Sequence, residues 1–183
     1  FGTLDMIKSL EWVNQNIRTF GGDPNNITIF GESAGARNVL SLYVAKPAED
    51  LFQRGIVQSG YLVSDSIEYS QNNPNSGSLT FVKNSIKKKN PAMNPMTLKE
   101  TLEDSNVLSN YLRDLSKEEI ISFYRVREDA GGLIDIPNVI PDGIIIPEEG
   151  IFESYINGKF QDKEIILGTN RDEHKLFMSG NPR

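Results

Sequence analysis

The sequence predicts an α/β fold with a mostly parallel sheet and flanking helices. Three short apolar runs, at residues 27–30, 55–58 and 164–168, have the length and composition of strands buried in a parallel sheet. Segments with helical spacing of apolar residues separate these runs, an alternation that is typical of α/β sheets. The first run leads directly into a G-x-S-x-G pattern.

An amphipathic helix is expected before the first strand. Its apolar residues are spaced four, three and four apart and therefore share one face, and they are Met6, Leu10, Val13 and Ile17. Asp5 suits the positive end of the helix dipole, and residues 21–22, both glycine, end the helix near Phe20. This glycine pair could serve as an oxyanion loop, but it precedes the strand and so lies at the end remote from Ser33.

Residues 26–36 predict a nucleophile elbow, because they read NITIFGESAGA. The apolar run ahead of the motif suits an inner strand of the sheet. Gly31 and Gly35 let strand and helix backbone approach closely, and Ser33 takes a strained conformation that lifts its hydroxyl from the sheet. The helix that starts at Ala34 directs its free amides toward an oxyanion, so the Ala34 N–H is the expected donor.

The elements after the elbow continue the alternation. Residues 36–44 form a helix that Pro47 terminates, and residues 55–58 form the second strand. Ser59 at the end of this strand is a rival nucleophile, but it lacks the paired glycines of an elbow, and we interpret it as a polar strand-end residue.

The middle of the chain, residues 61–130, is expected to be a helical region that covers an active-site face like a cap. Turn-rich tracts at residues 71–77 and 90–95 frame short helices, expected at residues 79–86, 107–112 and 116–124. Ser116 and Glu119 form a capping box that opens the last of these helices.

Residues 131–183 return the chain to the core that residues 1–60 begin, so the whole forms a single partial domain. A structured loop at residues 136–143 and a helix at 147–156 lead into the third strand, with Glu173 just beyond its end. Because ligands of parallel sheets bind at the carboxyl ends of the strands, Glu173 and Ser33 are expected to share a crevice.

Serine hydrolysis requires a nucleophile, a base, an acid that orients the base, and oxyanion donors. Ser33 and Glu173 follow the order serine, acid, histidine of α/β hydrolases, which leaves the histidine to come later. His174 is the single histidine, but side chains of adjacent residues diverge, so we do not expect it to be the base.

Composition excludes several function classes. A net charge of −6 argues against nucleic-acid binding, and the only dense basic run, residues 87–89, is expected in a solvated loop. The chain has no cysteine, no run long enough to cross a membrane and no signal pattern, which favours a cytoplasmic location. We expect no cofactor and no metal ion. Because it begins at Phe1, the chain is expected to be a piece of a longer protein.

The chain resembles the type-B carboxylesterase family, which includes cholinesterases and bacterial para-nitrobenzyl esterases. The matching stretches are GTLD with SLEWVNQNI at residues 2–17, FGGDPNNITIFGESAGA at 20–36, LFQRGIVQSG at 51–60 and ILGTNRDE at 166–173. The resemblance implies a partial α/β-hydrolase fold without its N-terminal strands. It further implies Ser33 as nucleophile, Glu173 rather than Asp172 as acid, the Ala34 amide as oxyanion donor and Glu32 as a nearby acidic group.

Two departures from the family pattern bear on function. The family usually has glycine where His174 stands, and its glycine-rich oxyanion loop and catalytic histidine fall outside residues 1–183. We therefore expect a serine esterase that cleaves a small neutral carboxylic ester in its full-length form, with the isolated chain inactive and self-associating through an exposed sheet edge. A non-catalytic binding or adhesion module, or another α/β hydrolase such as a lipase or peptidase, are the alternatives.

Overall fold

A computed structural model describes residues 2–124, 126–127, 133–134, 138–173 and 175. These residues divide into two compact units. Unit 1 comprises residues up to 66 and from 138 to 176, and unit 2 is centred on residues 67–137. None of the helices in the described ranges is long and apolar enough to cross a membrane.

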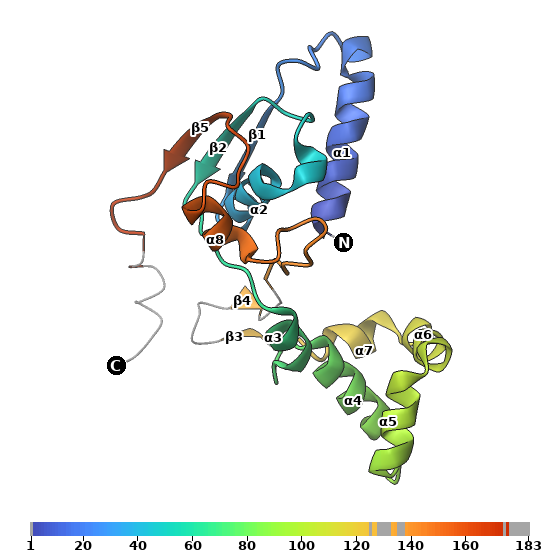
Figure 1. Ribbon diagram of the computed structural model, residues 1–183. Helices are drawn as coiled ribbons and strands as arrows, with labels where there is room; N and C mark the ends of the chain where they lie inside the picture. The colour runs from blue at the N-terminus through green and yellow to red at the C-terminus, as the bar shows by residue number, and fades with distance from the viewer. Residues whose placement is uncertain (1, 125, 128–132, 135–137, 174, 176–183) are drawn as a thin grey trace. The chain divides into compact units, whose positions relative to one another are not determined.

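Unit 1 is an α/β layer built on a three-stranded sheet, which Figure 1 shows together with its helices. The strands are β1 (Thr28–Glu32), β2 (Arg54–Gln58) and β5 (Glu164–Gly168), all parallel and in the order β1-β2-β5. The helices are α1 (Gly2–Asn16), α2 (Ala34–Val44) and α8 (Gly150–Ile156), with short 3₁₀ helices at Ile17–Phe20 and Lys46–Ala48. The predicted α/β fold and each of its three strands are confirmed.

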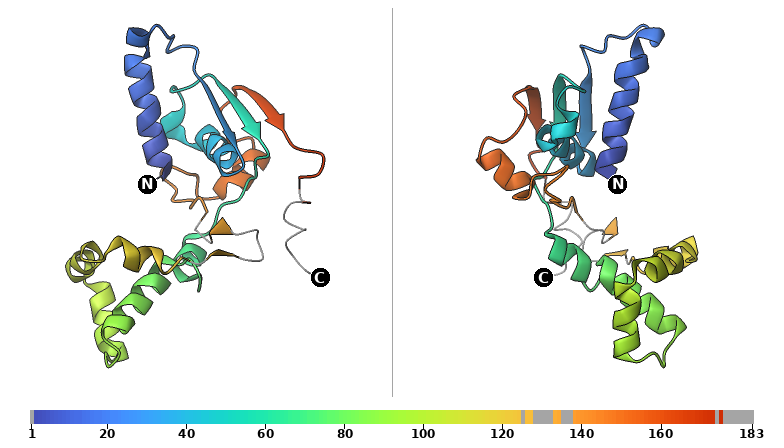
Figure 2. Two further views of the ribbon diagram at one scale, coloured as in Figure 1. Left: turned by 180° about the vertical axis from the view of Figure 1, so that it is seen from behind. Right: turned by 45° about the vertical axis from the view of Figure 1, so that its right-hand side comes forward.

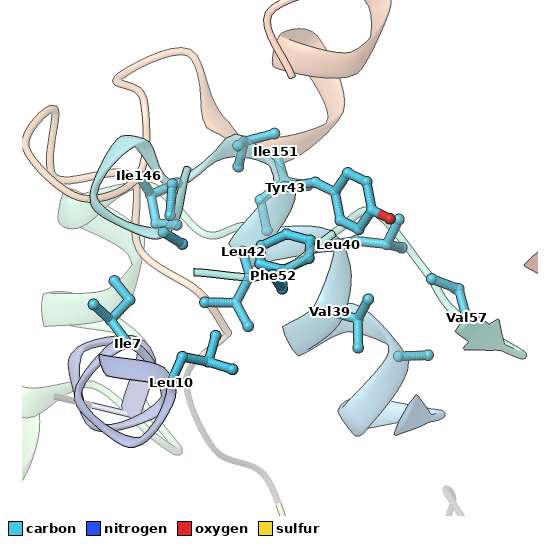
Figure 3. Packing of buried hydrophobic residues seen from close by; sticks show 14 residues of the cluster. Ile7, Leu10, Val39, Leu40, Leu42, Tyr43, Phe52, Val57, Ile146 and Ile151 are labelled. Carbon is cyan, nitrogen blue, oxygen red and sulfur yellow. The ribbon is translucent and has the colours of Figure 1, made fainter. Parts of the chain in front are cut away.

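Helix α2 is the centre of the unit 1 core. It packs on β1 and β2 and contacts α1 and α8. Nearly every α2 residue from Ala36 onward is buried, as expected for a helix that is covered on several sides. In Figure 3 the side chains of Ile7 and Leu10 from α1 lie on one flank of α2, while the rings of Tyr43 and Phe52 meet edge to face at 5.1 Å.

The two faces of the sheet differ in their cover. Gly55 and Val57 are buried beneath α2, and an added Cβ at Gly55 would stand 2.6 Å from the Tyr43 hydroxyl. Because side chains alternate along a strand, the row Phe30–Ile56–Ile166 lies on the opposite face. Phe30 is 75% exposed and Ile166 is 64% exposed in this row. In the described part of the chain β1 is an edge strand, which agrees with the expected exposed sheet edge.

Unit 2 is mainly helical and has its own core. Its elements are α3 (Ile67–Asn72), α4 (Ser78–Lys89), α5 (Pro95–Glu103), α6 (Ser105–Arg113), α7 (Lys117–Ile121) and the antiparallel pair β3 (Val126–Arg127) and β4 (Leu133–Ile134). Figure 2 shows α4 and α5 from two further sides. Val82, Ile86 and Leu98 form the buried cluster between these helices.

Sequence reasoning located three of these helices and missed two. The capping box is present, since Ser116 Oγ accepts from the Glu119 amide and the Glu119 carboxylate accepts from the Ser116 amide. Helices α3 and α5 were not predicted; α5 begins after Asn94, whose side chain accepts from the Thr97 amide. The loop expected at residues 87–89 is wrong, because these lysines form the last turn of α4, where cations are favourable to the helix dipole.

Candidate functional site

Ser33 occupies the joint between β1 and α2. Its backbone has φ 54° and ψ −114°, a conformation that residues other than glycine rarely adopt. Two hydrogen bonds hold it there: the Ser33 amide donates to the Gln58 carbonyl at 2.9 Å, and the Arg37 amide donates to the Ser33 carbonyl at 3.0 Å. Ser33 therefore takes part in the last hydrogen bond of the sheet and in the first hydrogen bond of the helix, and its backbone is strained.

Gly31 makes this sharp joint possible. A Cβ at Gly31 would stand 2.3 Å from the Gly35 carbonyl carbon and 2.8 Å from the Ala36 nitrogen, both backbone atoms. Only a glycine lets β1 and the first turn of α2 approach so closely. Gly35, by contrast, has no described atom within 4 Å of an added Cβ other than the backbone of its own helix and its chain neighbours. Sequence reasoning gave both glycines the same role, whereas the structure assigns the close approach to Gly31.

The Ser33 hydroxyl is exposed and does not cap the helix. Serine at an N-cap normally accepts a hydrogen bond from a first-turn amide, but the Ser33 side chain makes no such bond. Ala34, also exposed, carries one of the first-turn amides that lack an acceptor within the helix. In this arrangement the hydroxyl can attack a carbonyl group, and the free amides of the helix N-terminus can stabilise the oxyanion that results.

Glu173 lies in the turn that follows β5 and is half-buried. Its Oε2 accepts from the Thr169 hydroxyl at 3.1 Å and from the Asn170 amide at 2.5 Å. These two bonds fix one carboxylate oxygen against the backbone of the turn. The carboxylate therefore has a defined orientation at the carboxyl end of β5.

Ser33 and Glu173 both follow the carboxyl ends of strands in the same sheet, with one strand between those two strands. Ser33 follows β1, Glu173 follows β5, and β2 lies between these parallel strands. The end of β2 is hydrogen-bonded to both neighbouring segments. The Gln58 carbonyl accepts from the Ser33 amide, and the Ser59 amide donates to the Gly168 carbonyl at 2.8 Å. Two inter-strand spacings put the ends of β1 and β5 about 10 Å apart.

The other sequence candidates occupy distinct places. Glu32 is the exposed last residue of β1, and strand alternation puts its side chain on the face of the sheet that carries Phe30. His174 lies outside the described residues. Within the described ranges, no group of three or more His, Cys, Asp and Glu side chains is arranged to hold a metal ion.

Sequence analysis placed Ser59 at a strand end but did not predict its unusual backbone or its contact with Asn170 at the carboxyl end of the sheet. Ser59 has φ 53°, so it shares the unusual backbone of Ser33, and its Oγ accepts from Asn170 Nδ2 at 3.5 Å. The sequence signal for this contact was that both residues lie just beyond the carboxyl end of a strand. Ser59 begins no helix, so first-turn amides do not surround its hydroxyl as they surround that of Ser33.

Comparisons with known proteins agree on one family. The model of the carboxylesterase family matches residues 1–183. Cholinesterase 1 of Branchiostoma lanceolatum is 33% identical over 181 residues, covering 97% of this chain and 47% of that protein. Para-nitrobenzyl esterase of Bacillus subtilis (strain 168) is 31% identical over 179 residues, covering 97% of this chain and 32% of the esterase.

A third relative and a solved structure complete the comparison. Human neuroligin-3 is 32% identical over 194 residues, covering 98% of this chain and 19% of that protein. A solved PNB esterase structure superposes with a TM-score of 0.69 at 28% identity, covering 96% of this chain and 34% of that chain. The chain therefore spans at most about half the length of these relatives.

Proposed function

The chain belongs to the carboxylesterase family, and on this premise we propose that the full protein hydrolyses neutral carboxylic esters through an acyl intermediate on Ser33. The observation that carries the proposal is the strained Ser33 backbone, which presents an exposed hydroxyl that caps no helix amide. Strain of this kind costs of order 1–3 kcal/mol, so its presence at a serine favours a functional role.

Each group has a definite part in the proposed reaction. Ser33 Oγ attacks the ester carbonyl carbon as its proton passes to a histidine base, contributed by polypeptide outside residues 1–183. The Ala34 amide stabilises the oxyanion. The same histidine protonates the departing alcohol, and a water molecule then releases the acid from Ser33. Glu173 orients the imidazole, whose place is the gap of about 10 Å between the ends of β1 and β5.

Glu32 has a supporting part in the proposal. It precedes Ser33 at the end of β1, but alternation along the strand turns its side chain to the face opposite α2. We assign it an electrostatic influence on the site and no contact with the reacting atoms.

A fluorophosphonate probe and a panel of esters test the proposal in the full protein. We expect ester turnover, one covalent label that peptide mass spectrometry maps to residue 33, and loss of both in Ser33→Ala. A label on Ser59 would transfer the nucleophile to the rival serine. Hydrolysis of peptides in preference to esters would favour another class of α/β hydrolase.

The second candidate is a non-catalytic binding module, which the similarity to neuroligin-3 leaves open. The free Ser33 hydroxyl and the oriented Glu173 carboxylate support catalysis, since a binding module needs neither. Absence of turnover and label in the correctly folded full protein would favour the binding module.

The 183-residue chain by itself is proposed to be inactive and to self-associate. Without a base the serine is a weak nucleophile, and loss of further oxyanion donors slows reaction by about two to three orders of magnitude. The apolar row Phe30–Ile56–Ile166 and the unpaired edge of β1 favour pairing with a second copy. Rapid labelling of the isolated chain, or a monodisperse monomer in light scattering, would contradict these two proposals.

A further inference from the structure

Arg37 is a buried cation one helical turn after Ser33. It is 9% exposed, and it is the one charged residue among the buried residues of α2. Its amide donates to the Ser33 carbonyl, so the backbone of Arg37 is directly joined to the elbow. Burying a guanidinium is costly unless it has partners, which makes the partners of Arg37 informative.

The side chain of Arg37 is held by two segments that are far apart in the sequence. Nη1 donates to Asn138 Oδ1, and the guanidinium carbon lies 5.2 Å from the centre of the Tyr61 ring. Within the described part of the chain, Nε has no hydrogen-bond partner. The side chain therefore depends on Asn138 and on the Tyr61 ring for its orientation.

Asn138 is in turn bound to Asp65. The Asn138 amide donates to Asp65 Oδ2 at 3.0 Å, and Nδ2 lies 3.1 Å from both carboxylate oxygens. The Asp65 amide donates to the Val139 carbonyl at 2.9 Å, next to a parallel bridge between Ser64 and Val139. The guanidinium and the carboxylate are thus joined through one neutral amide, which both charges polarise in the same direction.

The chain leaves unit 1 for unit 2 just after Asp65 and returns just before Asn138. We call these two crossing points the passages. Unit 2 begins at Ile67, and its main segment ends at Pro137. All three members of the Arg37–Asn138–Asp65 network belong to unit 1. The network consequently ties the helix that begins at Ser33 to both passages.

We propose that Arg37 is a positioning residue, which couples the geometry of Ser33 to the two passages through Asn138. Loosening either passage frees the guanidinium, and the first turn of α2 with its bond to the Ser33 carbonyl then loosens as well. The part of this proposal that concerns reactivity rests on the proposed function, while the mechanical coupling does not. The reactivity of Ser33 thereby becomes sensitive to events in residues 67–137.

A double-mutant cycle in the full protein tests the coupling. Arg37→Met removes the guanidinium but keeps the stem, and Asn138→Ala removes the linking amide from a point 101 residues away. We expect each variant to slow fluorophosphonate labelling of Ser33 about tenfold, and the double variant to be no slower than the slower single one. Arg37→Lys keeps the charge and one donor, and it should recover most of the rate.

Arg54→Met is the matched control. Arg54 is an exposed arginine at the opposite end of β2, where its Nε donates to Glu164 at 2.5 Å. We expect this variant to label within twofold of the parent. Equal slowing in Arg54→Met, or multiplied effects in the double variant, would overturn the proposal.

Amide hydrogen exchange gives a readout that does not depend on activity. In Asn138→Ala, exchange at the Asp65 and Arg37 amides should accelerate at least about tenfold, because both report on the network. Unchanged exchange at Arg37 would refute the coupling even if labelling slows. If the folded parent protein fails to label at all, the proposed function fails, and the exchange measurement still decides the coupling. Should Arg37→Met not fold, Asn138→Ala and Arg37→Lys carry the same test.

Discussion

The two glycines of the elbow should respond in opposite ways to the same added methyl group. In Gly31→Ala, the new Cβ would stand 2.3 Å from the Gly35 carbonyl carbon, 2.4 Å from its oxygen and 2.8 Å from the Ala36 nitrogen. Carbon atoms in contact normally lie about 3.5–4.0 Å apart, so the start of α2 must retreat by about 1 Å. Backbone atoms cannot rotate away from the clash as a side chain could.

The stability and reactivity costs of Gly31→Ala follow from this displacement. Overpacking of a well-packed site costs about 1–3 kcal/mol, and we expect the upper end because the obstruction is backbone. A displacement of about 1 Å of reacting groups can lower a rate by about 100-fold, so labelling of Ser33 should fall by this factor. Urea unfolding followed by circular dichroism measures the first effect, and fluorophosphonate labelling of the full protein measures the second.

Gly35→Ala is the matched control two residues from Ser33. Gly35 lies in α2, its φ is not positive, and apart from its chain neighbours and the backbone of its own helix no described atom lies within 4 Å of an added Cβ. Alanine reduces the conformational freedom of the unfolded chain and favours helix, so we expect a gain of about 0.5–1 kcal/mol. Equal stability of Gly31→Ala and the parent would refute the close-approach reasoning. Equal damage from both substitutions would show that a Cβ at Gly35 is also obstructed.

Three further predictions concern local energetics. Ser33→Gly should be more stable than Ser33→Ala by about 1–2 kcal/mol in urea unfolding, because only glycine relieves φ 54°; equal midpoints would contradict the strain. Burial raises the pKa of Asp142, but hydrogen bonds from the amides of residues 144–146 outweigh burial and lower that pKa overall. The stabilisation of the fold by the Asp142 carboxylate should therefore be present above about pH 4 and lost as the pH falls further. Asp142→Asn should abolish this acid sensitivity, and Asp142→Ala should lower the unfolding free energy by about 1–2 kcal/mol at pH 7. Tyr43→Phe removes the 2.9 Å bond to the Glu164 carbonyl and should lower the unfolding free energy by about 1 kcal/mol, whereas an unchanged midpoint would show that this bond contributes nothing net.

Helices with local start and stop signals were predictable, and those without them were not. The capping box at Ser116 and Glu119 located α7 because its donors and acceptors are three residues apart. Helix α5 was missed, although its Asn94 cap and Pro95 are start signals, because the run of apolar residues that follows is short. The lysines at residues 87–89 suggested solvent, yet helix and loop both expose them, so charge alone could not distinguish the two.

The candidate site was predictable only in part. Ser33 and its helix follow from the spacing of G-x-S-x-G, because that turn is encoded within five residues. Glu173 was placed by a general rule about the carboxyl ends of parallel strands. The network of Arg37, Asn138 and Asp65 has no local signature, since its members come from three separate segments that only the folded chain brings together.

The sequence alone predicted the three strands and the tight turn at Ser33, because strand alternation, helix periodicity and tight turns depend on neighbours in the chain. Tertiary structure decided that β2 lies between β1 and β5, so Ser33 and Glu173 follow strands that are not neighbours in the sheet. It also decided that Gly31 and not Gly35 allows the close approach, and that a buried arginine links the elbow to both passages into unit 2. These features depend on distances between residues remote in sequence, and no local pattern encodes such distances.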